Sequence, residues 1–496
     1  MNKTLLVLLA FLTSNLFAQE ILTPLQKNGY SRPTSYDELA GYIQQLEKSG
    51  LIKTEVLAKS VQGRSIFGVK FSSSEFGKDP SKIKVLFLAQ QHGNEQGGKE
   101  GALLLMQELL KPENQYLFNR IDLVIVPQMN PDGSETNHRR NGNGMDLNRN
   151  HLILTEPETT GLHRLFDKYL FEVTMDIHEY SPYGESWQKY GYRNNSDLLL
   201  GSATNSNVPE KLRNLSNNGF IPFINDFLDA RHVSNFIYSP GGPPEIDYIR
   251  HSTFDINDGR QSFAIQNTFS FIQEGLNGKD GLSDSIRHRA ECHMKGMLGL
   301  LVYSYTNCRE LKKLVADERK NLINGTPARV SIQSEHARNG KILPLPLISY
   351  STGNDSVVNV SDYRPVVKSI YDVQKPAGYL VPRQLKELSQ WVERQGIINT
   401  PYEPKNSDKI EIYVVQSIDS IDFEEDIVVN PALIVKQPVK PINPDDYIYL
   451  PTRQLKGDMI VIALEPKSML GLVTYKEFSH LLRQGEEFPV LRVIKK

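Results

Sequence analysis

The chain has 496 residues, and at roughly 100–200 residues per domain this length predicts two to four domains. Its 56 Lys and Arg residues nearly balance its 58 Asp and Glu residues, which argues against a basic surface for nucleic acid or membranes. With 39% hydrophobic and 23% charged residues the chain is globular, and its two cysteines exclude a disulfide framework and a Cys-rich zinc site.

The first 18 residues are typical of a secretory signal peptide. Lys3 supplies the positive charge, an apolar run follows over residues 5–12, and cleavage is expected after Ala18. The alternative is a buried N-terminal helix. No later apolar stretch reaches the roughly 18 residues that span a bilayer. We therefore expect a secreted or periplasmic protein without an integral membrane segment after signal cleavage.

Strand and helix patterns alternate over residues 19–306. Buried strands are expected at 84–90, 121–128, 172–177 and 266–273, and helices at 97–110, 162–170 and 285–303. This alternation predicts an α/β fold whose central sheet is largely buried between helices.

Residues 307–496 have a different pattern and predict a β-rich C-terminal domain of unknown role. Prolines become frequent, and short runs rich in β-branched residues, such as 411–416 and 459–464, are typical of strands. One helix is expected at 383–394.

Potential metal ligands follow two of the expected strands. His92 and Glu95 lie in the loop after the strand at 84–90, and His178 ends the strand at 172–177. Sites in open α/β sheets gather outside the carboxyl ends of strands, so these side chains are expected to converge. Two histidines, one carboxylate and a water suit a catalytic zinc ion. Taken alone, His178 is equally well interpreted as a strand-end histidine without such a role.

The segment between these ligands, residues 130–150, is too polar for a core. Arg139, Arg140 and Arg149 offer guanidinium groups suited to carboxylates or to a developing oxyanion. Asn148 and Arg149 are adjacent and suit a terminal carboxylate. The alternative is a solvated loop with turn asparagines.

With these motifs, the sequence resembles the zinc carboxypeptidases of the carboxypeptidase A type. The motifs occur in the family's order: His92-x-x-Glu95, Asn130-Pro131-Asp132-Gly133, Arg139-x-Asn141, Asp146-Leu147-Asn148-Arg149-Asn150 and His178. The resemblance covers about residues 35–305, and the C-terminal extension is similar to tails of some bacterial members. It implies a mixed eight-stranded-type central sheet flanked by helices, a catalytic domain at 19–306, and one Zn²⁺ per chain.

The resemblance also implies the reaction and the roles of single residues. A metal-activated water would hydrolyse the C-terminal peptide bond of a peptide substrate. His92, Glu95 and His178 would bind zinc. Glu274, after the strand run at 266–273, would be the general base, and Arg139 would polarise the scissile carbonyl.

Substrate contacts follow from the same resemblance. Asn148 and Arg149 would hold the substrate's C-terminal carboxylate, and Arg140 is an alternative to Arg139. Tyr248 is our choice for the substrate-contacting tyrosine, with Tyr238 as the alternative.

The pattern leaves several residues open. In the stretch that shapes the side-chain pocket, Asp255 and Asp258 favour basic substrate ends, whereas Arg260 favours acidic ones. Glu179 either orients a metal ligand or is exposed. His288 and His293 are interpreted as structural or surface residues. The spacing of Cys292 and Cys308 does not decide whether they form a disulfide.

Two other functions remain alternatives. The same scaffold, according to the resemblance, also serves the hydrolysis of cell-wall muropeptides and of N-acyl amino acids. From a different class, the chain is a catalytically inactive binding protein whose β-rich domain binds a glycan or a partner.

Overall fold

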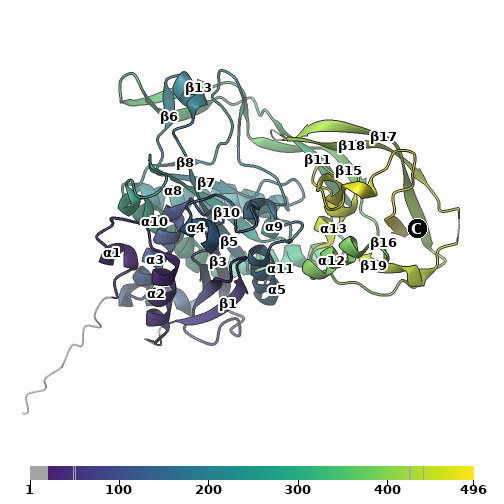
Figure 1. The fold of residues 1–496 in the computed structure, drawn as a ribbon, viewed down its shortest axis with the longest axis horizontal. Coiled ribbons are helices and arrows are strands. Elements are labelled where there is room, and N and C mark those ends of the chain that lie inside the picture. The colour runs from purple at the N-terminus through teal and green to yellow at the C-terminus, as the bar shows by residue number, and fades with distance from the viewer. Residues whose placement is uncertain (1–20, 49, 51, 424–425, 440, 496) are drawn as a thin grey trace, which may run out of the picture.

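The computed structural model describes residues 21–48, 50, 52–423, 426–439 and 441–495 (Figure 1). The predicted signal peptide, with its cleavage point after Ala18, lies outside these residues. Among the helices of the described chain, none combines the length and apolar character needed to cross a membrane.

An eight-stranded mixed sheet forms the centre of the N-terminal part. In spatial order its strands are β1 (Lys53–Lys59), β2 (Ser65–Phe71), β4 (Ile121–Val126), β3 (Ile83–Ala89), β5 (Val173–Tyr180), β10 (Phe269–Leu276), β7 (Leu198–Ser202) and β8 (Asn235–Ile237). The neighbours β4–β3, β3–β5, β5–β10 and β7–β8 are parallel, and the other pairs are antiparallel. The predicted α/β fold with a mixed eight-stranded sheet is confirmed.

Helices cover both faces of this sheet because the central strands are apolar on both sides. Val85 and Phe87 of β3 belong to one core, and Leu86 and Leu88 belong to the opposite core. The first core is closed by α2 (Tyr36–Lys48), α3 (Gln96–Leu109), α8 (Ile221–Asp229), α10 (Ile286–Thr306) and α11 (Cys308–Ile323), and the second by α5 (Pro157–Tyr169) and α9 (Gly259–Ala264). The shorter helices are α1 (Pro24–Lys27), α4 (Pro131–Glu135), α6 (Glu185–Lys189) and α7 (Glu210–Leu215).

The strand predicted at 266–273 begins and ends three residues later in the structure. Residues 259–264 form α9, and the chain then turns through Asn267, whose φ is 56°. The strand β10 therefore begins at Phe269 and continues to Leu276. As a result Glu274 lies inside the strand, not behind it.

The C-terminal part consists mainly of small sheets, which confirms the predicted β-rich region. The largest has the order β18 (Asp426–Lys436), β17 (Asp408–Phe423), β20 (Leu491–Lys495), β16 (Gly378–Pro382) and β19 (Tyr447–Pro451). A second sheet pairs β11 (Arg329–Ala337) with β15 (Val366–Gln374). In Figure 1 these two sheets lie to the right of the eight-stranded sheet, with α12 (Lys386–Arg394) and α13 (Gly457–Leu464) on the side facing it.

Two further small sheets join the N-terminal and C-terminal parts of the chain. The hairpin of β12 (Leu343–Ser349) and β13 (Asp355–Val360) is extended by β6 (Tyr192–Asn194). The strand β14 (Tyr363–Arg364) pairs in parallel with β9 (Ile249–Arg250). The C-terminal part is therefore bonded to segments that precede the last strand of the main sheet.

One predicted strand is wrong. Residues 459–464 lie in α13, where every residue is buried. An apolar segment that is buried on all sides has no periodicity that separates a helix from a strand. The other predictions for this part hold, since 411–416 lies within β17 and the predicted helix at 383–394 contains α12.

The predicted division after residue 306 falls between α10 and α11. Leu311 and Val315 of α11 still belong to the core of the main sheet. A separate core includes Trp391 and Ile460 of the C-terminal part, together with Leu152 and Ile256 from the N-terminal part. The division between two domains therefore stays a prediction.

Candidate metal and substrate site

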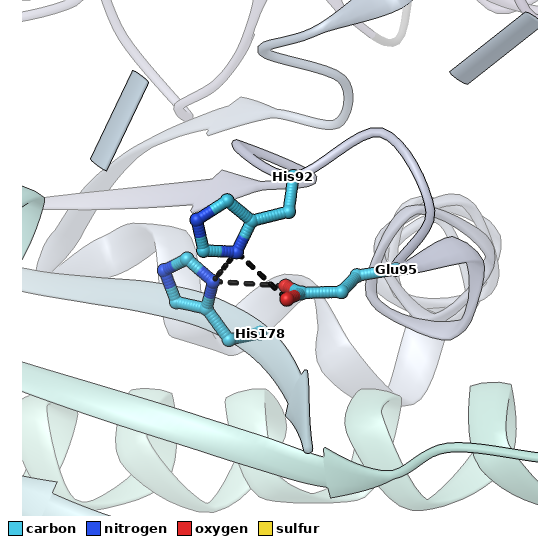
Figure 2. Close-up of side chains that lie close together, drawn as sticks. All are labelled: His92, Glu95 and His178. Atoms are coloured by element: carbon cyan, nitrogen blue, oxygen red, sulfur yellow. Dashed lines mark hydrogen bonds and ion pairs between the residues drawn. The ribbon is translucent and has the colours of Figure 1, made fainter. Parts of the chain in front are cut away.

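The three predicted metal ligands meet at the carboxyl ends of β3 and β5 (Figure 2). The Nδ1 atom of His92 lies 2.7 Å from Glu95 Oε1, and that of His178 lies 2.9 Å from Glu95 Oε2. The two Nδ1 atoms are 3.2 Å apart, and all three side chains are buried. Two imidazole nitrogens and a carboxylate thus face one point, which is a donor set suited to Zn²⁺.

The loop that carries His92 and Glu95 is fixed by close packing. A Cβ atom at Gly93 would lie 2.1 Å from the carbonyl carbon of Gly133, so only glycine fits where this loop meets α4. Asn130 caps α4 through Gly133 N, and its Nδ2 donates to the carbonyls of Gln91 and Arg139. The Asn-Pro-Asp-Gly motif therefore joins the ligand loop to the arginine loop.

Each histidine is also held by a carboxylate on its second nitrogen. His92 Nε2 lies 3.1 Å from Asp146 Oδ1, and His178 Nε2 lies 3.0 Å from Asp176 Oδ1. Such carboxylates orient the rings of metal-binding histidines and make them better ligands. Neither aspartate was predicted from the sequence to have a role. Asp146 begins the motif at residues 146–150, and Asp176 shares the β5 face of His178 because alternate residues of a strand point the same way.

The charges of this cluster reinforce one another. Burial alone would raise the pKa of the Glu95 carboxyl, but the two histidines hold it well below its usual value. Burial alone would lower the pKa of His178, but Asp176 and Glu95 raise it well above the usual value. A metal ion that binds here must displace protons from the imidazoles.

Glu274 lies beside the cluster on the neighbouring strand. It stands directly opposite His178 in the parallel register of β10 and β5, and adjacent strands are about 4.8 Å apart. Burial is the main cause that raises the pKa of Glu274 to about 7, and the charge of Glu95 adds to it. A buried carboxyl with a near-neutral pKa beside a metal site is suited to proton transfer.

Arg139 reaches the cluster from the solvent side. Its Nε donates to Asp146 Oδ2 at 3.0 Å, and its Nη2 forms an ion pair with the same oxygen at 2.9 Å. Its Nη1 lies 3.7 Å from Glu95 Oε1. Arg140 instead donates to the carbonyl of Gly144. Of the two neighbouring arginines, Arg139 is therefore the one in contact with the candidate metal site.

Asn148 and Arg149 occupy different environments. Asn148 is buried, and its Oδ1 accepts from Gln91 Nε2 at 3.1 Å and from the backbone N of Gly259 at 2.7 Å. Its Nδ2 lies 3.3 Å from His178 Nε2. Arg149 is exposed. Desolvation opposes the charge of Arg149, but the carboxylates of Asp255 and Asp146 raise its pKa. In this arrangement Asn148 supports His178, and Arg149 offers the exposed cation.

The two candidate tyrosines also differ. The ring of Tyr248 lies 4.0 Å from the guanidinium carbon of Arg364, in the C-terminal part. Burial and the charge of Glu274 raise the pKa of the Tyr238 hydroxyl. Tyr238 therefore shares the electrostatic surroundings of Glu274.

The residues left open by the sequence are mostly structural. Arg260 is buried and donates to Ser252, Thr253 and Asp258, while Asp258 caps α9. These two residues thus hold the loop before α9. Asp255 is the first of the carboxylates that offset desolvation and raise the pKa of Arg149.

Glu179 is likewise buried, not exposed. Both of its carboxylate oxygens accept from Arg289 at 2.8 Å, and one also accepts from the backbone N of Gly97. His293 is buried against Gln273. The two cysteines, Cys292 and Cys308, are not bridged.

Comparisons with known proteins agree with this site. Residues 39–219 match the zinc carboxypeptidase family. Carboxypeptidase 2 of Trichophyton rubrum is 22% identical over 499 residues, which cover 94% of this chain and 88% of that protein. Carboxypeptidase D of Homo sapiens is 29% identical over 143 residues, which are 25% of this chain and 10% of that protein. The similarity to the fungal protein thus includes the C-terminal part.

Among solved structures, the metallo-carboxypeptidase from Burkholderia cenocepacia aligns with a TM-score of 0.44 and 18% identity, over 56% of this chain and 71% of that one. The metallo-carboxypeptidase from Pseudomonas aeruginosa in complex with (2-guanidinoethylmercapto)succinic acid aligns with a TM-score of 0.43 and 22% identity, over 57% and 71% of the two chains.

Proposed function

We propose that this chain removes the C-terminal residue of peptides in a zinc-dependent reaction. The chain carries a zinc carboxypeptidase domain and is a hydrolase of the metallocarboxypeptidase class. The observation that supports this most strongly is the position of Glu274 directly opposite His178, beside the convergent side chains of His92 and Glu95. A potential general base and a set of metal-binding side chains thus lie together at the ends of neighbouring strands.

The donor set fits zinc. His92, Glu95 and His178 would hold the ion, because their ligand atoms lie within 4.8 Å of one another and both histidines present Nδ1 to Glu95. Zinc bound there supplies Lewis acidity, which polarises a carbonyl and lowers the pKa of a water molecule.

Two side chains of this protein act on the reacting groups. Glu274 in its ionised form accepts a proton from the attacking water and then delivers it to the nitrogen of the leaving amine. Arg139 donates to the carbonyl oxygen as that oxygen becomes negative, and its guanidinium is held in place by Asp146.

Recognition of the chain end falls mainly to Arg149. Its exposed guanidinium suits the terminal carboxylate, and this requirement restricts hydrolysis to the last peptide bond. Asn148 would act through His178, which its amide approaches. Tyr248 and Tyr238 are the two candidates for the tyrosine that contacts the substrate, and the charge of Glu274 acts on the Tyr238 hydroxyl.

The test is to identify the products released from defined substrates. The zinc-loaded protein is incubated with unmodified peptides, with muropeptides and with N-acyl amino acids, and the products are read by mass spectrometry. We expect single amino acids from the C-terminus of the peptides. Release of diaminopimelate from muropeptides alone, or hydrolysis of N-acyl amino acids alone, would move the function to one of these alternatives. No product from any class would favour a binding protein.

We further propose that the protein is exported, on the strength of the sequence pattern of residues 1–18. N-terminal sequencing of the mature protein from its native host tests this, with Gln19 expected as the first residue. A mature protein that begins at Met1 would contradict it.

A further inference from the structure

A second group of metal-binding side chains lies apart from the candidate zinc site. His288 and Cys292 are one turn apart on α10, and Asp197 directly precedes β7. His288 Nε2 lies 2.7 Å from Asp197 Oδ1 and 3.6 Å from Cys292 Sγ. The ligand atoms of all three residues lie within 4.8 Å of one another.

The geometry differs from that of a catalytic Cys-His-Asp relay. In a relay the thiol and the carboxylate contact opposite nitrogens of the ring. Here Cys292 Sγ is closer to Nε2 of His288 than to Nδ1, at 3.6 against 3.9 Å, and Asp197 also contacts Nε2. Sulfur, nitrogen and oxygen atoms therefore surround one point, as the ligands of a metal ion do.

The residues around this group orient its side chains and leave space for an ion. Asp197 Oδ2 accepts from the backbone N and the Oγ of Ser234, at 3.0 and 2.7 Å, which turns Oδ1 toward His288. A cavity of about 90 Å³ is lined by the three residues together with Asn277, Asp284 and Arg289, whose guanidinium is paired with Glu179. Cys292 is buried while His288 is exposed, so an ion can enter from solvent.

We propose that Asp197, His288 and Cys292 bind a second divalent metal ion of the zinc type. A thiolate, an imidazole and a carboxylate are the ligands that Zn²⁺ takes in proteins, and water can complete the coordination. The thiol releases its proton when the ion binds. Such an ion would tie α10 to the segment before β7.

Cobalt distinguishes this site from the candidate catalytic one, because only a thiolate ligand gives a near-ultraviolet thiolate-to-cobalt absorption band. The full chain, free of metal and with both thiols reduced, is titrated with Co²⁺. We expect this band in the wild-type protein and its loss in Cys292→Ser. Cys308→Ser is the matched control and keeps the band, since Cys308 Sγ contacts the backbone carbonyls of Ser81 and Arg120.

Zinc content gives a second readout. We expect two zinc ions per wild-type chain and one in His288→Ala or in Cys292→Ser. His178→Ala tests the other site and keeps the thiolate band. The absence of the band in wild-type protein, its persistence in Cys292→Ser, or equal zinc content in wild type and Cys292→Ser would overturn the second site.

The C-terminal part carries an independent inference, because it holds the segment that follows Arg149. Trp391 Nε1 donates to the carbonyl of Leu152 at 2.9 Å. Gln395 Nε2 donates to the carbonyls of His151 and Leu152 at 3.0 and 2.6 Å. Trp391 is fully buried. Two side chains of the α12 region thus fix the backbone two and three residues after Arg149.

The same part of the chain also holds the loop before α9. The Tyr475 hydroxyl accepts from Asn257 Nδ2 at 3.2 Å, and the carbonyl of Asn257 accepts from the backbone N of His151. Phe254 stacks edge-on against Phe423. Both loops that flank the Arg149 side of the site are therefore attached to the C-terminal part.

We infer that Trp391 and Gln395 are positioning residues for Arg149, an inference that rests on the proposed function. The side chains that contact the metal ligands, namely Asp146, Asp176, Asn148 and Arg139, all precede residue 306. The C-terminal part would thus govern how the substrate's end is held, and the N-terminal part would govern the metal.

Kinetics of full-length variants test this. Trp391→Phe and Gln395→Ala are expected to raise KM for peptides about three- to tenfold, with zinc content unchanged. The effect should vanish in an Arg149→Ala background, which a purely structural role would not predict. His480→Ala is the control, because the exposed His480 contacts Glu387 on the same helix. If the wild type has no peptidase activity, the proposed function fails. If the wild type is active and KM stays unchanged, or if the effects are additive with Arg149→Ala, this inference alone fails.

Discussion

Asp146 contacts His92 on the side of the imidazole ring that faces away from Glu95. Its Oδ1 lies 3.1 Å from His92 Nε2, while His92 Nδ1 lies 2.7 Å from Glu95. The second oxygen of Asp146 accepts a hydrogen bond from Arg139 Nε and forms an ion pair with Arg139 Nη2. One carboxylate therefore orients a proposed metal ligand and the proposed oxyanion donor together.

Asp146→Asn should weaken zinc binding about 10- to 100-fold, because a neutral amide orients and polarises His92 less well. The affinity is measured by competition with a chromophoric chelator. Asp317→Asn, at an exposed pair with Lys313, is the control and should bind zinc like the wild type. Unchanged affinity in Asp146→Asn would show that His92 does not depend on this contact.

Glu274→Gln should reduce kcat by about two to four orders of magnitude, since the amide cannot accept the proton of the attacking water. Zinc content should stay at the wild-type level, because Glu274 is not among the proposed ligands. Steady-state kinetics and elemental analysis of the same sample check both points. Wild-type kcat in this variant would remove Glu274 from the mechanism.

The rate should depend on pH through Glu274. Only the ionised carboxylate accepts a proton, so kcat/KM falls as the pH falls through the pKa of Glu274. Burial raises this pKa to about 7 in the protein without metal, and the positive charge of zinc favours the ionised form. The acid limb of the zinc enzyme therefore has its midpoint below about 7. A pH profile of kcat/KM measures it, and a profile that is flat on the acid side would contradict the assignment.

Arg149→Ala should raise KM for peptides with a free C-terminal carboxylate by roughly 10- to 100-fold, the loss expected for hydrogen bonds to a charged group. Arg149→Lys should restore only part of the loss, because an ammonium cannot bind a carboxylate with a planar fork. Arg140→Ala is the matched control, since Arg140 donates to Gly144 and not to the site. Equal effects of Arg149→Ala and Arg140→Ala would argue against the proposed clamp.

The convergence of the metal ligands was predictable because it follows from topology. The strand patterns at 84–90 and 172–177 place His92 and His178 at the carboxyl ends of parallel strands, and β3 and β5 are neighbours in the sheet. The helix at 459–464 was not predictable in this way. Its residues are all apolar, so they show neither the helical nor the strand periodicity. Their complete burial in the C-terminal core is seen only in the structure.

The detailed contacts of the site depend on residues that are distant in sequence. Asn148 was expected to face the substrate, yet its amide lies between Gln91, His178 and the backbone of Gly259. Trp391 reaches Leu152 from the far end of the chain. Spacing within a motif carries no information on such contacts, so the roles proposed for Asn148 and for the C-terminal part rest on the structure.

The most direct test of the account compares a peptide that has a free C-terminal carboxylate with the same peptide as its C-terminal amide. Both are incubated with the protein as zinc-loaded, metal-stripped and zinc-restored samples, and the products are read by mass spectrometry. We expect stepwise loss of single residues from the free acid only, and we expect metal removal to abolish this activity and Zn²⁺ to restore it. Equal hydrolysis of the amide, internal cleavage, or full activity after metal removal would contradict it.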